Sequence, residues 1–448
     1  MNSPSPSSLP VHHPQQILAW HQGTPITGER FLQDVATLVV KLPDAGHLCN
    51  LCDNHYHFMV SFAAAMSRKQ ITLMPPNNTA GAVNDMLSEY PDSYCLSDKP
   101  MSDILVNQFL FTDLMEHRIS HAAPLPLQMS REQQVAILFT SGSTGKPKAN
   151  LKTWGELQSE AASALHHFPF QTRSIASLVA TVPAQHMYGL ATSVLFPWHG
   201  GMTVYAGRPL FPADIAKALT SIPTPRVLIT TPLHLRACLG ADLDWPDIDF
   251  VISATAPLSR ELAIEAEQRM STEIHEIYGS TETGSIAGRR TLADQAWQLY
   301  QGISIDRRNA QAVVSGNHLP QPAPLNDRVK ILAENRFLLL GRDSDMLKIA
   351  GKRASLGDLT HKLLEIPGVI DGVFLLPDNL QNGKQRLTAL VVAPEQTKQQ
   401  ILSELARSID AAFLPRPLHL VGSLPRNSTG KLPHAQLLNL LERMTEKR

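Results

Sequence analysis

The sequence predicts an α/β protein, with a large, layered α/β N-terminal domain and a small, mobile α+β C-terminal domain. Short β-branched runs recur between about residues 10 and 340, and helical patterns separate them. This alternation is typical of α/β layers with largely parallel strands. It ends after Gly341. The predicted parts are a disordered tail (1–10), a large domain (11–341), a hinge (342–345) and a small domain (346–448).

The large domain is expected to place its functional loops where parallel strands end, because such loops gather at the carboxyl edge of the sheet. Five of the predicted strands are Ile71–Leu73, Val135–Phe139, Ile175–Thr181, Arg226–Thr230 and Phe250–Ala254.

The small domain is expected to begin with a strand at Leu347–Ala350. A helix then starts near Ser355, with Asp358 as part of a capping box. Two further strands are predicted near 370–376 and 386–393, before a helix over Thr397–Phe413.

Composition limits the function classes. The 448 residues exceed what one hydrophobic core supports, and 43% of them are apolar, so two or three structural units are expected. The 39 basic and 40 acidic residues nearly cancel, so neither nucleic acid nor an anionic membrane is expected as the main partner. No run approaches the roughly 18 apolar residues that span a bilayer, and Met1–Ser8 lacks signal-peptide features. We therefore expect a cytoplasmic protein without a membrane span.

The four cysteines leave two interpretations open. Cys49 and Cys52, followed by His55 and His57, have a spacing that occurs in zinc sites, but no second close cysteine pair completes a tetrahedral set. The commoner alternative is a buried strand and turn leading into a helix over 58–66, in which small cysteines fill space.

The strongest chemical signal is the stretch Phe-Thr-Ser-Gly-Ser-Thr-Gly-Lys-Pro-Lys at 139–148, directly after an apolar run. Glycines allow a sharp turn that exposes backbone N–H groups, and hydroxyls and lysines add donors and positive charge. The stretch therefore predicts a polyphosphate cradle, rather than an ordinary polar loop. It is not a Walker A motif, which needs glycine at Thr140 and Ser or Thr at Pro147. The cradle residues are Thr140, Ser141, Gly142, Ser143, Thr144, Gly145, Lys146 and Lys148.

A second polar loop, Tyr278–Gly284, follows the predicted strand Glu273–Ile277. A carboxylate beside a phosphate cradle is repulsive unless a cation lies between them. Glu282 is therefore predicted to be a Mg²⁺ ligand, with the metal shared by phosphate oxygens. Taken alone, the loop is also compatible with an ordinary glycine-bounded turn.

A third segment, Leu424–Lys431, places a glycine and a lysine in a polar loop near the C-terminus. Such a loop can carry the ammonium of Lys431 into a site on the other domain. The alternative is a solvated lysine, the usual state near a chain end.

Five segments together resemble one superfamily. They are the cradle at 139–148, Tyr-Gly-x-Thr-Glu at 278–282, Gly-Arg-x-x-Asp at 341–345, Lys-Ile-x-Gly at 348–351 and Pro-Arg-x-x-x-Gly-Lys at 425–431. In this order they resemble the adenylate-forming superfamily of acyl- and aryl-CoA synthetases, peptide-synthetase adenylation domains and luciferases. The resemblance extends over about residues 25–440.

The resemblance implies ATP and Mg²⁺ as cofactors. Residues 140–148 would wrap the β- and γ-phosphates, and Glu282 would hold the metal. Tyr278, followed by Gly279 and Ser280, would stack on the adenine. The other side of the base would be lined by Ala254, Thr255 and Ala256.

The resemblance also implies the remaining roles. Thr281 would bond the α-phosphate, and Asp327 would accept both ribose hydroxyls, assisted by Arg342. Lys431 would bridge the substrate carboxylate and the α-phosphate. Fixed cations aimed at this anionic centre lower the barrier to adenylation.

Two positions depart from the family pattern. The ribose segment is usually Thr-Gly-Asp, whereas this chain has Leu325-Asn-Asp327, so its turn must form without glycine. The hinge position is commonly Asp or Lys, whereas Ser344 stands here between two aspartates.

The segment Pro183–Gly189 contains no carboxylate. Because a buried substrate ammonium would lack its counter-charge, amino-acid substrates are disfavoured. The pattern Pro-x-x-His-x-Tyr-Gly resembles the acyl- and aryl-acid members, in which His186 would begin the helix lining the acyl pocket. His186 as a packed core residue is an equal alternative. Further pocket candidates from the family layout are Thr231, Pro232, His234 and Ser253.

The implied reaction is ATP-dependent activation of a non-amino carboxylic acid, aryl or fatty, as acyl-AMP with release of pyrophosphate. Transfer to a pantetheine thiol of CoA or of an acyl carrier protein would follow. Two alternatives stay open: a non-catalytic nucleotide-binding or carrier-docking module of the same fold, and a luciferase-like oxidation of the adenylate.

Overall fold

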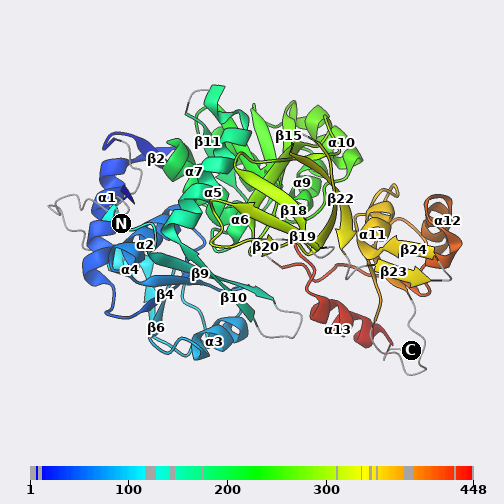
Figure 1. The fold of residues 1–448 in the computed structure, drawn as a ribbon, viewed down its shortest axis with the longest axis horizontal. Coiled ribbons are helices and arrows are strands. Elements are labelled where there is room, and N and C mark those ends of the chain that lie inside the picture. The colour runs from blue at the N-terminus through cyan, green and yellow to red at the C-terminus, as the bar shows by residue number, and fades with distance from the viewer. Residues whose placement is uncertain are drawn as a thin grey trace.

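Two large β-sheets organise the chain up to Arg342 in the computed structural model (Figure 1). A smaller domain, coloured from yellow to red, lies at one end of the molecule (Figure 1). The structure describes residues 7–8, 13–116, 128–141, 147–172, 175–308, 311–333, 335–342, 346–349, 352–377, 387–427 and 430–445.

The first sheet has six strands in the order β10-β9-β5-β4-β6-β7. All neighbours pair in parallel except β10, which runs antiparallel to β9. Helix α2 (His55–Ser67) is buried along most of its length, because it carries apolar residues on every face. In sheet order, the strands span Pro147–Thr153, Gln134–Ser141, Ile71–Met74, His47–Leu51, Ser93–Ser97 and Gln108–Leu110.

The second sheet has eleven strands in the order β21-β22-β17-β16-β15-β14-β13-β11-β12-β2-β3. Strands β15 to β2 in this order form a parallel centre, and antiparallel strands extend it on both sides. In sheet order, the strands span Asp327–Ile331, Arg336–Arg342, Trp297–Leu299, Gly284–Arg290, Glu273–Ser280, Phe250–Ser253, Arg226–Thr230, Ser177–Ala180, Thr203–Tyr205, Ile17–His21 and Thr24–Thr27.

Helices connect and cover these strands. The largest hydrophobic core contains fully buried side chains of α2 and of α5 (Trp154–His167), together with strand residues. A second core packs α8, α9 and α10 against the other face of the parallel strands. The remaining helices of this part are α1 (Gly28–Lys41), α3 (Ala80–Ser88), α4 (Phe111–Met115), α6 (Met187–Gly189), α7 (Phe196–Gly200), α8 (Pro212–Thr220), α9 (Pro232–Leu239) and α10 (Arg260–Met270).

Short elements complete the large domain. A three-stranded sheet, β18-β19-β20, precedes β21, and a π-helical turn, η2 (Leu190–Leu195), joins α6 to α7. The strands of this sheet span Ile303–Arg308, Gln311–Gly316 and Ala323–Pro324. The other short elements are β1 (Ser7–Ser8), β8 (Gln128–Met129) and the 3₁₀ turn η1 (Pro169–Thr172).

The small domain has the predicted α+β character. Its three-stranded sheet, β25-β26-β27, packs one face on α11 and α12 and the other on α13. The elements are β23 (Met346–Ile349), β24 (Lys352–Ser355), α11 (Leu356–Leu364), β25 (Asp371–Leu375), β26 (Thr388–Val392), α12 (Lys398–Ser408), η4 (Ala411–Phe413), β27 (Leu418–Leu420) and α13 (His434–Thr445).

Most of the predicted elements exist. The five predicted strands correspond to β5, β9, β11, β13 and β14. Ser355 caps α11 by accepting the N–H of Asp358 at 2.9 Å. The helix predicted over Thr397–Phe413 is too long: α12 ends at Ser408, because Asp410 caps a separate 3₁₀ turn through the N–H of Ala412.

The hinge stays a prediction. Arg342 is the last residue of β22, and residues 343–345 lie outside the described part of the chain. Among the helices that the structure describes, none combines the length and apolarity that crossing a membrane requires.

Candidate active site

The adenine-binding segments predicted at 254–256 and 278–282 lie at the ends of two neighbouring parallel strands. Strand β14 ends at Ser253, and β15, paired with it in parallel, ends at Ser280. Between them Thr255 has φ of +81°. A β-branched residue rarely adopts this conformation, and such strained positions cluster at functional sites. The expected segments are therefore neighbours at one edge of the sheet.

The segment 278–284 is a tight hairpin, so the strand predicted to end at Ile277 continues to Ser280 and the loop is a short turn. Strand β15 continues to Ser280, and β16 returns from Gly284. The hairpin requires glycine, because a Cβ on Gly279 would lie 2.1 Å from the carbonyl oxygen of Gly284. Thr281 and Glu282 lie in its turn.

Hydrogen bonds within the turn hold this hairpin. The N–H of Ser280 donates to Oγ1 of Thr283, and the N–H of Thr283 donates to Oγ of Ser280, both at 3.1 Å. These reciprocal bonds fix the backbone on both sides of Thr281 and Glu282. The two side chains assigned to phosphate and metal are thus carried by a well-held turn.

Two buried residues that the sequence interpretation missed support the hairpin from behind. Nε2 of His318 lies 2.7 Å from the carbonyl oxygen of Thr283, and Oε1 of Glu160 accepts the N–H of Ser285 at 2.8 Å. Burial raises the pKa of Glu160, while the charge of Lys152 acts in the opposite direction. The sequence could have indicated Glu160, because this carboxylate falls on the buried face of α5, together with Leu157 and Ala164.

Tyr278 and Asp327, predicted to bind adenine and ribose, contact one another. Oη of Tyr278 donates to Oδ2 of Asp327 at 2.7 Å. The tyrosine ring packs beside Trp297 and Phe337, with centroid distances of 5.4 and 5.5 Å. These contacts orient both the ring and the carboxylate before any nucleotide binds.

Asp327 and Arg342 are directly opposite one another in the β21–β22 ladder. The structure therefore brings the two predicted ribose residues together in the backbone register. Asn326 does not adopt a positive φ, which explains why this turn forms without the glycine that is usual in the family.

The cradle and the hairpin meet through an ion pair. Thr140 and Ser141 end β9, and Lys148 pairs with Thr140 across the β9–β10 ladder. Nζ of Lys148 lies 3.8 Å from Oε1 of Glu282, whose side chain is 29% exposed. The predicted phosphate and metal residues therefore converge. The cradle residues Gly142, Ser143, Thr144, Gly145 and Lys146 lie outside the described residues.

His186 occupies the N-cap position of α6, without a side-chain capping hydrogen bond, so it does begin this helix. Burial, then the charge of Lys431 and then that of Arg208, lower its pKa to about 4. His186 is therefore neutral at pH 7. The loop carrying Lys431 contacts the large domain, since a Cβ on Gly430 would lie 3.6 Å from Leu233 and 3.7 Å from Oγ1 of Thr231.

Further pocket candidates surround the end of β13. Nδ1 of His234 lies 3.0 Å from Oγ1 of Thr181 and 3.2 Å from Oγ1 of Thr231. Oη of Tyr188 donates to the carbonyl oxygens of Thr230 and Ile252, at 3.1 and 2.9 Å. Tyr188 thereby ties α6 to the ends of two parallel strands.

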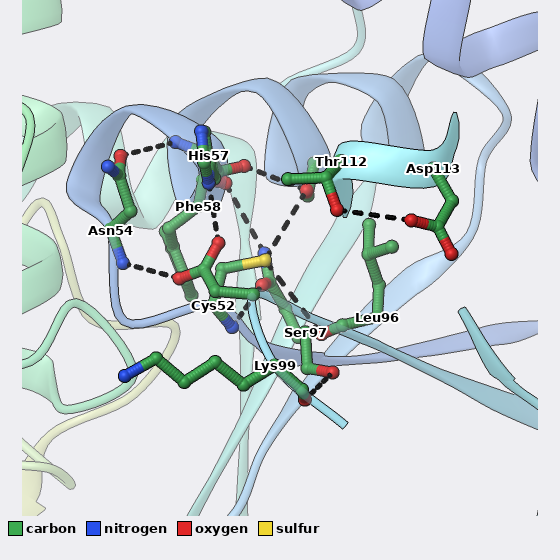
Figure 2. Close-up of polar contacts among 12 residues, drawn as sticks. Cys52, Asn54, His57, Phe58, Leu96, Ser97, Lys99, Thr112 and Asp113 are labelled. Carbon is green, nitrogen blue, oxygen red and sulfur yellow. Dashed lines mark hydrogen bonds and ion pairs between the residues drawn. The ribbon is translucent and has the colours of Figure 1, made fainter. Parts of the chain in front are cut away.

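The cysteines and histidines at 49–57 take part in core packing and local hydrogen bonds. All four cysteines are buried. Figure 2 shows Cys52 and His57 with separate partners: the thiol points to the carbonyl of Leu96 at 3.9 Å, and Nδ1 of His57 lies 2.5 Å from Asp98. Nδ1 and Nε2 of His55 lie near backbone carbonyl oxygens, at 3.1 and 3.0 Å. These contacts support the space-filling interpretation of the cysteines.

A family model described as "AMP-binding enzyme" matches residues 51–336, more than half of the chain. This chain belongs to the AMP-binding enzyme family. The matched region of this AMP-binding enzyme contains the cradle, the hairpin and Asp327. The adenylate-forming resemblance is thereby confirmed at the level of the family.

Relatives and solved structures agree with this family. The 4-coumarate–CoA ligase of Rhodobacter capsulatus is 29% identical over 351 residues, which cover 78% of this chain and 87% of that protein. The O-succinylbenzoate-CoA synthetase MenE of Bacillus subtilis, solved with ATP and a magnesium ion, has a TM-score of 0.82 at 16% identity, covering 97% of this chain and 100% of that one.

Two structures of one further protein share the fold. ATP-bound MatB from Rhodopseudomonas palustris has a TM-score of 0.80 at 16% identity, covering 98% of this chain and 99% of that one. Apo MatB has a TM-score of 0.68 at the same identity, with 96% and 97% covered.

Proposed function

We propose that this enzyme is an AMP-forming acid–thiol ligase that activates a non-amino carboxylic acid with ATP and transfers the acyl group to CoA. In the first step the carboxylate attacks the α-phosphorus of ATP, and pyrophosphate leaves. In the second step the thiol sulfur attacks the carbonyl carbon of the acyl-AMP, and AMP leaves. The 4-coumarate–CoA ligase of Rhodobacter capsulatus bears the name of such a reaction.

One observation carries this proposal. The loop of the small domain that carries Lys431 contacts the large domain at the start of α9, since a Cβ on Gly430 would lie 3.6 Å from Leu233 and 3.7 Å from Oγ1 of Thr231. The cation assigned to the reacting carboxylate and α-phosphate therefore belongs to a loop that packs against Thr231, a candidate for the acyl pocket. A fixed ammonium at this point stabilises the negative charge that develops during adenylation.

The residues present fit Mg²⁺-ATP. Glu282 offers a partly exposed carboxylate next to Lys148, and Mg²⁺ prefers one or two carboxylates together with phosphate oxygens and waters. We assign Glu282 to the metal, Tyr278 to the adenine and Asp327, with Arg342, to the ribose. When bound, the metal neutralises phosphate charge.

The more specific part of the proposal concerns the carboxylic acid substrate and the thiol acceptor. The acid is an aryl or fatty acid, since the segment before α6 offers no carboxylate to an amino group. CoA is the acceptor we propose first, and the phosphopantetheine of an acyl carrier protein presents the same thiol. We place the reaction in the cytoplasm.

The test is carboxylate-dependent exchange of labelled pyrophosphate into ATP, over a panel of hydroxycinnamic, benzoic and fatty acids. Exchange with at least one acid, followed by thioester formation with CoA or with a carrier protein, is the expected result. The absence of exchange over the whole panel, with ATP still bound, would favour a non-catalytic module. Oxygen consumption with the acyl-AMP would favour the luciferase-like reaction.

A further inference from the structure

The peptide group that joins Gly430 to Lys431 is held at both of its polar atoms. The guanidinium of Arg426 donates through Nη1 to the carbonyl oxygen of Gly430. The N–H of Lys431 donates to Oδ1 of Asn427 at 2.9 Å. Because both groups belong to one peptide plane, its orientation is fixed, and with it the direction in which the Lys431 side chain leaves the backbone.

Arg426 is itself anchored in the small domain. Its Nε donates to Oδ2 of Asp371 at 2.7 Å, and its Nη2 donates to Oδ1 at 2.6 Å. Both side chains are largely buried, at 18% and 14% exposure. A paired arginine–carboxylate contact of this kind is strong and geometrically specific, and lysine cannot reproduce it.

The peptide held in this way faces the large domain. A Cβ on Gly430 would lie 3.6 Å from Leu233, which belongs to α9.

We propose that Arg426 is a positioning residue for adenylation: anchored by Asp371, it orients the Gly430–Lys431 peptide and with it the ammonium of Lys431. This inference rests on the proposed function. The Arg426–Asp371 pair lies within the small domain and moves with it, so its loss should affect the half-reaction that uses Lys431.

The test compares Arg426→Lys with the wild type in two separate half-reactions. Adenylation is measured by pyrophosphate exchange, and thioester formation is measured from supplied acyl-AMP. Arg426→Lys should lower kcat of adenylation by about tenfold to a hundredfold, the range that a misplacement of about 1 Å produces. KM for ATP and for the acid, and the rate of thioester formation, should stay within about twofold.

A matched control is Arg407→Lys. Arg407 pairs with Glu404 at 2.7 Å on the exposed face of α12, within the same domain. This variant should leave both half-reactions unchanged. Equal losses in both half-reactions, in parallel with a lower melting temperature, would identify Arg426 as merely structural and overturn the proposal.

If Arg426→Lys does not fold, Asp371→Asn replaces it, since asparagine keeps the shape but removes the charge. Failure of the wild type to exchange pyrophosphate would refute the proposed function, and wild-type exchange with unaffected variants would refute this inference.

Discussion

The hydrogen bond between Tyr278 and Asp327 yields a quantitative prediction about nucleotide binding. Tyr278→Phe removes the hydroxyl that donates to Oδ2 of Asp327 at 2.7 Å. It retains the ring beside Trp297 and Phe337. The variant should unfold more easily and bind ATP more weakly, while the adenine-stacking face stays in place.

The magnitude follows from the geometry. A hydrogen bond to a charged group contributes about 1.5–3 kcal/mol, and partial exposure favours the lower end, so the free energy of unfolding should fall by about 1.5 kcal/mol. Without the hydroxyl, Asp327 must be ordered when the ribose binds, which costs about 0.5–1 kcal/mol. This loss corresponds to a rise of about twofold to fivefold in the dissociation constant of ATP.

The assay is a double-mutant cycle with Asp327→Ala, followed by urea unfolding and by calorimetric titration with ATP. The unfolding data should give a coupling free energy of about 1–1.5 kcal/mol. Tyr94→Phe is the control, because it removes a hydroxyl that donates to Gln70 at 2.7 Å in the first sheet. It should lower stability without changing ATP binding. A coupling near zero, or an equal loss of ATP affinity in the control, would refute the reasoning.

Three further predictions concern catalysis, pH and the hairpin. Lys431→Ala should lower the rate of pyrophosphate exchange at least about a hundredfold, while thioester formation from supplied acyl-AMP stays within a few-fold; equal losses would argue against rotation of the small domain. His167, His186 and His234 each have a pKa lowered from 6.5 to about 4, mainly by burial. The unfolded chain therefore binds more protons below pH 6.5, so stability is greatest above that pH and falls towards pH 4, by up to about 2 kcal/mol per histidine at pH 5. Urea unfolding at pH 7 and 5 measures this, and His167→Gln should reduce the pH dependence; an unchanged dependence would exclude His167 as a contributor. Gly279→Ala would place a Cβ 2.1 Å from a backbone carbonyl oxygen across the hairpin, so it should abolish measurable ATP binding and lower the melting temperature, and wild-type ATP binding would contradict the assigned hairpin.

The sequence predicts the strands well where local composition decides them. Strand β13 has the predicted bounds, Arg226–Thr230, because an apolar β-branched run lies between polar breaks. The end of α12 was mispredicted, because apolar periodicity continues to Phe413 while Asp410 starts a new cap. Hydrophobic periodicity alone does not predict where a side chain such as that of Asp410 caps a new turn and ends the preceding helix.

The candidate site is predictable in its residue types and less so in its shape. Glycine, hydroxyl and lysine composition indicated the cradle, and the carboxylate of Glu282 indicated the metal. The hairpin form of the second segment comes from pairing between the consecutive strands β15 and β16, and the glycines at 279 and 284 are its local signal. The bond from Tyr278 to Asp327 joins residues 49 positions apart and has no local signature, because it arises only when distant strands meet.

The placement of β2 and β3 at one end of the eleven-stranded sheet has a consequence for biosynthesis. Ala19 of β2 pairs with Val204 of β12, so the earlier strand must leave the ribosome well before its partner exists. At translation rates of 5–20 residues per second, this interval is about 10–40 s. The six-stranded sheet, whose strands all lie between His47 and Thr153, can form during that interval. Until β12 is made, β2 lacks its partner, and an unpaired strand edge invites nonproductive pairing, so protection by chaperones would be valuable. Because β2 completes its pairing only with the later strand β12, the early and late segments of the large domain are expected to fold as one cooperative unit.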